Sequence, residues 1–312
     1  MIGTVLGLLL RAGFVLFGAA LATFALLWNA PGDPAEAIAM ARFDALLTED
    51  VIDQVRTEAG LDGTFWQAFR SWIGPLMVLD FGNSAVTGRP VWPDLWTAIG
   101  YTFPLAIAAL AIGMGVSVPL AMLAARRPGG WVDRLAVAAA SLGTAIPAFW
   151  LGLLLILLFA VHLGWLPAIG ARTPLHSILP ALTLGLGIAA SLTRIIRSGI
   201  LEARGQPFLP AFRRRGVAPS RLARDHVAPH AAVPVITVAG LELAFLLEGL
   251  VIVEVIFARP GLGTFLVSGI FSRDFPHVQA VVILTALVFV IVNLAIDLIY
   301  RLIDPRIGGT NA

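Results

Sequence analysis

Long stretches without a charged residue constrain the fold of this chain more than any other feature of its sequence. A helix needs about 20 apolar residues to cross the hydrocarbon core of a membrane. Five stretches contain no Asp, Glu, Lys or Arg: residues 12–32, 95–125, 135–171, 173–193 and 275–296. A sixth, at about 231–256, is apolar apart from three glutamates. The pattern predicts an all-α membrane protein with six transmembrane helices.

The composition supports this prediction. Only 13% of the 312 residues are charged and 58% are hydrophobic, whereas charged residues make up about a quarter of a soluble protein. A soluble surface of this size needs more polar groups than the chain contains. The sequence therefore predicts a membrane protein rather than a soluble one.

Two residue types are missing. The chain has no cysteine, and all 21 basic residues are arginine. A P-loop needs its lysine to hold phosphates, and a thiolate or disulfide site needs cysteine. We therefore expect that the chain is not an enzyme, hydrolyses no ATP by itself and binds no cofactor or metal. An intramembrane enzyme would need a nucleophile with its base or a full metal set, and neither is visible.

Arginine placement predicts the orientation. Residues 194–225 contain eight arginines and two acids, and residues 126–134 contain three arginines. By contrast, residues 33–94 contain ten acids and four arginines, a net charge of −6. Because basic loops stay in the cytoplasm, both termini are expected there, with 33–94 outside. A nucleic-acid surface is an alternative reading of the arginines, but topology alone explains them.

The first span raises the question of a signal peptide. Ala20-Leu21-Ala22 resembles a cleavage site. The apolar run continues through Trp28, however, and its nearby positive charge comes only at Arg11. We therefore expect an uncleaved membrane anchor.

The cytoplasmic loop at 198–230 is too long for a simple connection. Pro210 and Pro219 suit the first turns of two short helices, and Gly216 between them can adopt the positive φ of a reversal. An arginine-bearing helix with Leu209 and Phe212 as apolar anchors could lie in a groove of a partner protein. A solvated loop that obeys the positive-inside rule is the alternative.

This loop carries a resemblance to a known family. Residues 208–216 match, at identical spacing, the pattern Tyr-Val-Arg-Thr-Ala-Arg-Ala-Lys-Gly of the permease subunits of ABC-type dipeptide/oligopeptide/nickel importers. Pro210 replaces the usual Arg and Phe212 the usual Ala, and Pro207 is also unusual. Further blocks match in order: 31–35, 146–152, 163–167, 178–185, 226–227, 233–237, 253–257, 260–263, 273–276 and 302–306. The chain therefore resembles this family over nearly its whole length.

The resemblance implies a type I ABC importer permease in the bacterial inner membrane. Its implied partners are a homologous second permease, two ATP-binding subunits that hold ATP and Mg, an external solute-binding protein and membrane lipid, with no nucleic acid. Its implied substrates are peptides, nickel or metal chelates. Carried over by position, the segment that couples to the ATPase comprises Ala211, Phe212, Arg213, Arg214, Arg215, Gly216 and Ser220.

Three glutamates interrupt the span at 231–256. Glu242, Glu248 and Glu254 are six residues apart, which leaves a rotation of about 240° on a helix, so they do not share a face. A buried acid usually faces a cavity or a partner. We hypothesise that Glu248 and Glu242 line the translocation path, together with Phe149 and Trp150, and favour a cationic substrate. Pairing with a partner subunit, or protonation, is the alternative, and Glu254 is expected to be interfacial or structural.

Other polar residues carry weaker signals. His226 and His230 are four apart, as two metal ligands on one helix face would be, but no further ligand accompanies them. Asp297 and Arg301 are expected to form an i, i+4 ion pair.

A short amphipathic helix is expected from Gln54 onward, with Trp66, Trp72, Trp92 and Trp96 at the membrane interface. The acidic segment is read either as a surface for the binding protein or as a lid on the permease.

The sequence predicts a division of the chain into four parts. These are 1–32 for the first helix, 33–98 for the external segment, 99–306 for a five-helix core with coupling loop 198–230 and external loop 257–277, and 307–312 for the tail.

The sequence thus favours a permease subunit driven by a separate ATPase. An ion-gradient-driven secondary transporter of small solutes is the alternative, and the oversized basic loop argues against it.

Overall fold

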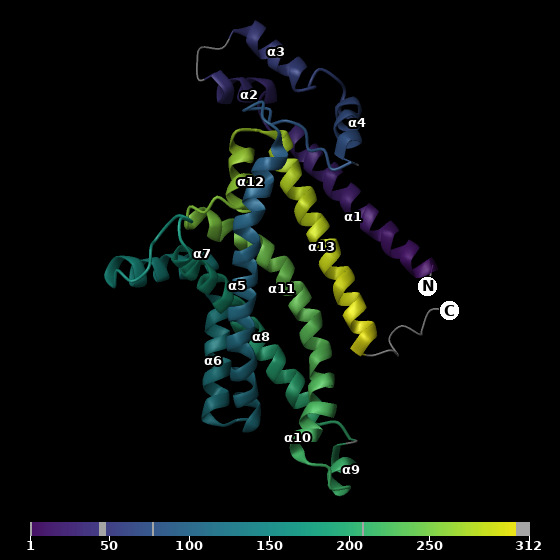
Figure 1. The fold of residues 1–312 in the computed structure, drawn as a ribbon, viewed down its shortest axis with the longest axis vertical. Helices are drawn as coiled ribbons and strands as arrows, with labels where there is room; N and C mark the ends of the chain where they lie inside the picture. The colour runs from purple at the N-terminus through teal and green to yellow at the C-terminus, as the bar shows by residue number, and fades with distance from the viewer. Residues whose placement is uncertain (1, 44–47, 77, 208, 304–312) are drawn as a thin grey trace. The chain divides into compact units, whose positions relative to one another are not determined.

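The chain is helical and packs as two compact units. The computed structural model describes residues 2–43, 48–76, 78–207 and 209–303, without the side chains at some positions of 2–9, 213–245 and 297–303. The first unit comprises Met1–Thr102 and Arg259–Ile291, and the second comprises Phe103–Ala258 and Val292–Ala312. Two long helices, α5 (Val91–Arg126) and α13 (Phe275–Ile303), each run from the first unit into the second (Figure 1).

The first unit combines long and short helices. Besides parts of α5 and α13, it contains α1 (Ile2–Trp28), α2 (Pro34–Phe43), α3 (Glu49–Glu58), α4 (Phe65–Leu76) and α12 (Leu262–Phe271). The helix predicted from Gln54 onward lies in α3, but α3 begins five residues earlier, and the sequence analysis missed α2 and α4. An aromatic cluster joins α1 to α4: the ring of Phe24 lies 5.7 Å from Trp72 and 5.4 Å from Phe69.

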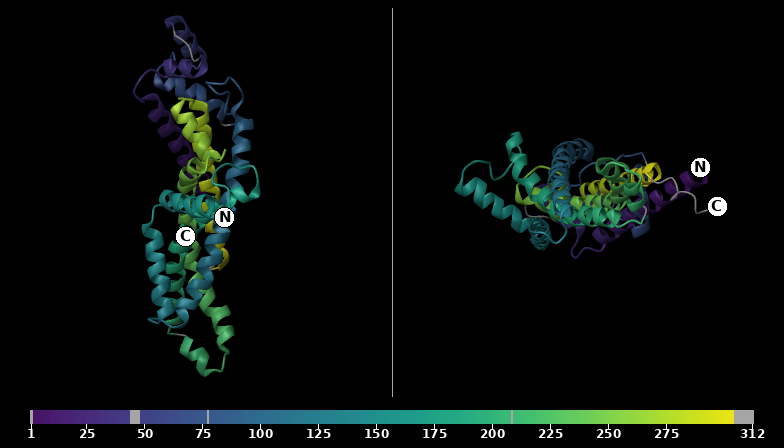
Figure 2. Two further views of the ribbon diagram at one scale, coloured as in Figure 1. Left: turned by 90° about the vertical axis from the view of Figure 1, so that its left-hand side faces the viewer. Right: turned by 90° about the horizontal axis from the view of Figure 1, so that it is seen from below.

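The second unit holds the helices that frame the predicted path and coupling segment. They are α6 (Trp131–Ala145), α7 (Ala148–Leu155), η1 (Ile156–His162), η2 (Pro174–Ser177), α8 (Ile178–Arg204), α9 (Leu209–Arg214), α10 (Pro219–Leu222), η3 (Ala223–Val227) and α11 (Ala228–Ile256). Its apolar core lies mainly between α5, α8 and α11, and includes Leu105, Leu192 and Leu250. Figure 2 shows α9 and α10 beyond the end of α8 and the start of α11.

Four helical segments are long and apolar enough to cross a membrane: Leu10–Trp28, Val91–Arg126, Pro174–Arg204 and Phe275–Ile296. They coincide with four of the predicted spans. The bent pair of α6 with α7 and η1 is a fifth candidate. The predicted span at about 231–256 lies in α11, whose 29 residues include many side chains outside the described set. A sixth crossing and the position of the termini therefore stay predictions.

The third predicted span is not one straight helix. The chain bends by 101° between α6 and α7. Pro147 lies at the bend, and the residue before it, Ile146, has extended backbone angles of φ −82° and ψ 121°. Proline disfavours helical angles in the preceding residue, which ends α6 there. The uncharged stretch 135–171 gave no prediction of this break.

Glycines let α5 and α8 approach closely. A Cβ atom on Gly185 of α8 would lie 2.7 Å from Cγ2 of Ile112 and 2.9 Å from the carbonyl oxygen of Ala109 on α5. A Cβ atom on Gly113 of α5 would lie 2.5 Å from Cγ2 of Ile188 on α8. Small residues at such crossings are typical of helix pairs that pack in membranes.

Two predicted loops contain helix. The predicted coupling loop begins at residue 198, but α8 continues to Arg204. The predicted external loop at 257–277 contains α12, whose ten mostly apolar residues are too few to span a membrane. The loop bounds came from counting only stretches long enough to cross a membrane, so neither helical segment was predicted, and the bounds themselves stay predictions.

Candidate functional site

The predicted coupling segment forms a short helical hairpin. The helix α9 is followed by a turn in which Gly216 has φ +76°, and α10 begins at Pro219. The N–H of Val217 donates to the carbonyl of Phe212 at 3.2 Å and closes the turn. Pro210 lies in the first turn of α9, where a missing N–H costs nothing. The structure thus confirms the two short helices and the left-handed glycine that the sequence predicts.

The hairpin exposes most of its predicted contact residues. Those exposed are Ala211, Arg214, Arg215, Gly216 and Ser220, whereas Phe212 is half-buried and the Arg213 side chain lies outside the described set. One expectation is wrong: Leu209 is only 2% exposed and packs within this chain, so it is not free to anchor a partner. The buried Leu222 of α10 is its counterpart on the other arm.

An ion pair ties α8, which leads into the hairpin, to α6. The guanidinium of Arg197 donates from two nitrogens to the carboxylate of Asp133, with an Nη2–Oδ2 distance of 2.7 Å. The Asp133 side chain is 4% exposed, and its Oδ2 also accepts the N–H of Gly129 at 2.8 Å. Two turns of helix beyond, Arg204 donates to the carbonyl of Ala125. The base of the hairpin is therefore fixed to the α5–α6 turn at two points.

The predicted path glutamates lie in different surroundings. Glu242 is half-buried on α11 and accepts a hydrogen bond from the hydroxyl of Ser191 on α8. Glu248 is exposed, and Glu254 is fully buried within the chain. Their separate environments agree with the prediction that the three do not share a face.

The aromatic path residues lie on another helix. Phe149 and Trp150 of α7 are 46% and 47% exposed. Among the described interactions, no hydrogen bond, ion pair or ring contact joins Phe149, Trp150, Glu242 and Glu248 to one another. The structure leaves the four as separate positions of the second unit, and their role in a path stays a prediction.

Two of the segments that carry the family resemblance are in contact in the first unit. Arg273 donates to the carbonyls of Pro31 and Gly32, so block 273–276 contacts block 31–35. Next to it, Asp274 accepts the hydroxyl of Ser84 and the N–H of Ala85, the latter at 3.0 Å. Its Oδ2 also lies 2.8 Å from Nδ1 of His277. The buried Asp274 carboxylate thus joins residues that are about 190 positions apart.

Several of the predicted residues have side chains outside the described set. The side chains of His226, His230, Asp297 and Arg301 lie outside the described set, as does Phe208. Among the described residues, no group of three or more His, Asp or Glu could hold a metal ion. Trp72 and Trp92 stack on Phe24 and Phe81 of the first unit, and Trp66 and Trp96 are exposed.

The sequence analysis missed three of these arrangements: the Asp133–Arg197 pair, the Ser191–Glu242 contact and the Asp274 cluster. Arg197 was read only as a topology signal, although it precedes the coupling loop. A charged residue inside an otherwise apolar helix is costly without a partner, and that rule would have pointed to an acid opposite Arg197.

Comparisons with known proteins identify relatives of this chain. The family described as binding-protein-dependent transport system inner membrane component matches residues 117–309. The glutathione transport system permease protein GsiC of Pectobacterium atrosepticum is 38% identical over 277 residues, which cover 89% of each chain. The protein of the same name from Escherichia coli strain K12 has the same identity and coverage.

Solved structures share the fold. An inward-facing MetNI methionine ABC transporter matches with a TM-score of 0.57 at 20% identity, over 68% of this chain and 96% of that chain. An amino acid ABC transporter solved with histidines matches with a TM-score of 0.55 at 19% identity, over 67% and 94%. This chain therefore belongs to the family of binding-protein-dependent transport system inner membrane components, and it is a permease subunit of an ABC importer.

Proposed function

We propose that this permease subunit imports short peptides and is driven by a separate ATPase that docks on α9. The observation that carries the proposal is the match to glutathione permeases over 89% of the chain. Glutathione is a tripeptide, so the relatives favour peptides over the nickel or metal chelates that the sequence left open. The second permease, two ATP-binding subunits and the external solute-binding protein are proposed partners.

The geometry of the hairpin supports docking at α9. Arg214 and Arg215 are exposed, and the buried Leu209 and Leu222 hold the two arms against the chain. A short helix that is fixed at its base and exposed at its tip can transmit a push from a partner. Since the chain contains no lysine for a P-loop, ATP hydrolysis is assigned to the partner, which would hold ATP and Mg.

The path is proposed to pass α11. Glu248 is exposed in this chain, and Glu242 is held by Ser191 at the contact of α8 with α11. Acids kept inside a span usually face a cavity or a partner. An exposed Glu248 would favour cationic peptides, whereas Phe149 and Trp150 offer apolar surface to their side chains.

Uptake into proteoliposomes tests the proposal. We expect the complete complex to accumulate glutathione only with ATP, the ATPase subunits and the solute-binding protein. Uptake that persists without the ATPase and collapses with an ion gradient would instead establish the secondary transporter.

The same assay tests the path. In Glu248→Gln, we expect uptake of a lysine-containing tripeptide to fall about fivefold relative to an uncharged one, as for unit charges about 4 Å apart in water. If the ratio of the two uptake rates is unchanged, Glu248 does not line the path.

A further inference from the structure

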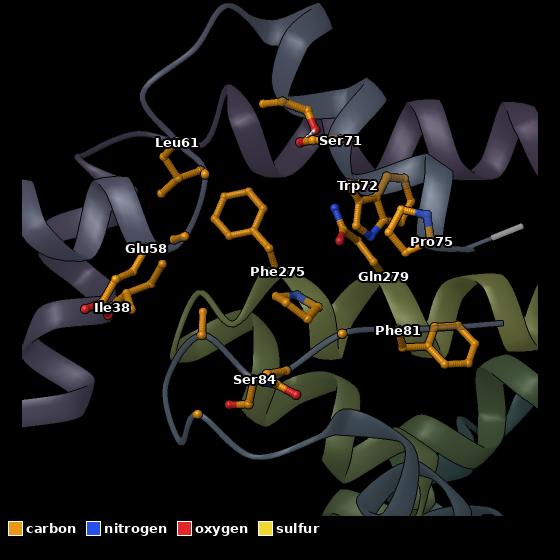
Figure 3. A pocket seen from close by; sticks show the side chains of 18 of the residues that line it. Ile38, Glu58, Leu61, Ser71, Trp72, Pro75, Phe81, Ser84, Phe275 and Gln279 are labelled. Carbon is orange, nitrogen blue, oxygen red and sulfur yellow. Dashed lines mark hydrogen bonds between the residues drawn. The ribbon is translucent and has the colours of Figure 1, made fainter. Parts of the chain in front are cut away.

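The first unit contains a cavity, and none of the proposed path residues lines it. Its volume is about 430 Å³, and α2, α3, α4, the segment 80–88 and the start of α13 form most of its wall (Figure 3). Pockets for small ligands start at about 300 Å³. Four aromatic residues line it: Phe24, Trp72, Phe81 and Phe275. The cavity is therefore large enough for a small organic ligand and offers flat apolar surfaces to it.

One buried polar group points into this cavity without a partner. Gln279 of α13 is 2% exposed, and its amide nitrogen has no hydrogen-bond partner. Figure 3 shows its amide directed into the cavity beside Trp72. Buried amide donors nearly always find an acceptor, and a carbonyl, a carboxylate or a water oxygen can serve as the acceptor for this nitrogen. A single water occupies only about 30 Å³, which leaves most of the cavity for a larger molecule.

The charged residues of the cavity lining favour a cation. Arg42 is committed to Glu58, at an Nη1–Oε2 distance of 2.6 Å, and to the carbonyl of Ala85. The hydrogen bond from Arg42 lowers the pKa of Glu58, which therefore stays ionised at neutral pH. Asp80 adds an exposed carboxylate, so the lining carries two acids against one arginine. This balance attracts an ammonium group.

We propose that this cavity binds a short peptide. A peptide carbonyl accepts from the amide of Gln279, an apolar side chain packs on Trp72 and Phe275, and the amino terminus lies near Glu58. A small peptide combines an acceptor, an apolar group and an ammonium in one molecule. The site belongs to the first unit alone and does not rest on the proposed transport function.

Binding of phenylalanylglycine to the full chain in lipid nanodiscs tests the proposal by calorimetry. Gln279→Leu is expected to weaken binding about tenfold, as for the loss of one hydrogen bond worth about 1.4 kcal/mol. Ser71→Phe is expected to abolish it, because Ser71 lines the cavity and a phenyl ring would fill the space. The control Gln67→Leu alters an exposed glutamine of α4 and should bind like the wild type.

Two further measurements make the test decisive. N-acetylated phenylalanylglycine lacks the ammonium and is expected to bind more weakly, and equal binding would overturn the role of Glu58. Thermal unfolding of each variant verifies its fold, and Gln279→Glu, which replaces the donor by an acceptor, provides a second variant of the same size. The proposal would be overturned if the folded Gln279 variants and Ser71→Phe bind like the wild type. It would also be overturned if the wild type does not bind. Both outcomes are independent of whether the complex transports peptides.

Discussion

Asp133→Ala is expected to lower the free energy of unfolding by about 2–4 kcal/mol, because it leaves the guanidinium of Arg197 without its carboxylate. Removing one partner of a buried pair costs about 3–5 kcal/mol, and the 23% exposure of the Arg197 side chain reduces that cost. The change also removes the acceptor of the Gly129 N–H at the start of α6. Denaturant titration of the detergent-solubilised chain, followed by tryptophan fluorescence, measures the loss.

A matched pair of variants checks that burial is the cause. Asp53 is 72% exposed and lies 3.5 Å from Arg56, so Asp53→Ala should cost no more than about 1 kcal/mol. The double replacement Asp133→Leu with Arg197→Met removes both charges and should recover most of the stability that Asp133→Ala loses. Equal losses for Asp133→Ala and Asp53→Ala would contradict the assigned role of the pair.

Asp274→Ala is expected to destabilise the first unit by about 3 kcal/mol. The buried carboxylate accepts from Ser84 and Ala85 and pairs with His277. Each buried donor that loses its acceptor costs about 1–3 kcal/mol, and partial rearrangement limits the sum. Hydrogen exchange of residues 84–88 reports the loss locally, and Asp62→Ala, at an exposed position of the same unit, should leave that exchange unchanged.

The same carboxylate predicts a pH dependence. Burial alone would raise the pKa of Asp274, but the contacts from His277, Ser84 and Ala85 outweigh it and lower the pKa. Because the pKa is lower in the folded state, the stabilisation is complete above the ordinary aspartate pKa and is lost as the pH falls through the lowered value. Asp274→Asn should therefore flatten the acid side of the stability profile, and an unchanged acid slope would refute this assignment.

The sequence predicted the elements whose signal is local. Uncharged stretches predicted the helices at Leu10–Trp28, Val91–Arg126, Pro174–Arg204 and Phe275–Ile296, because membrane insertion tolerates few charges. Two prolines and Gly216 predicted the hairpin of α9 and α10, because these residues restrict or permit particular backbone angles.

The parts that sequence analysis missed depend on contacts between distant residues. Arg273 reaches Pro31, and Asp274 reaches Ser84, although more than 180 positions separate each pair. Leu209 had the pattern of an exposed anchor, and only packing showed that it is buried. The orphan amide of Gln279 also has no local sequence signal, since its importance comes from the cavity around it.

Crosslinking from α9 tests most directly whether a separate ATPase drives this permease through that helix. The chain has no cysteine, so Ala211→Cys provides a single site on the exposed side of α9 for a short photoactivated crosslinker. Thr87→Cys, exposed in the first unit, is the control for random collision. The account predicts a crosslink to the ATPase subunit from position 211 and none from position 87. No ATPase adduct at position 211 in a complex that still performs ATP-dependent uptake would contradict it.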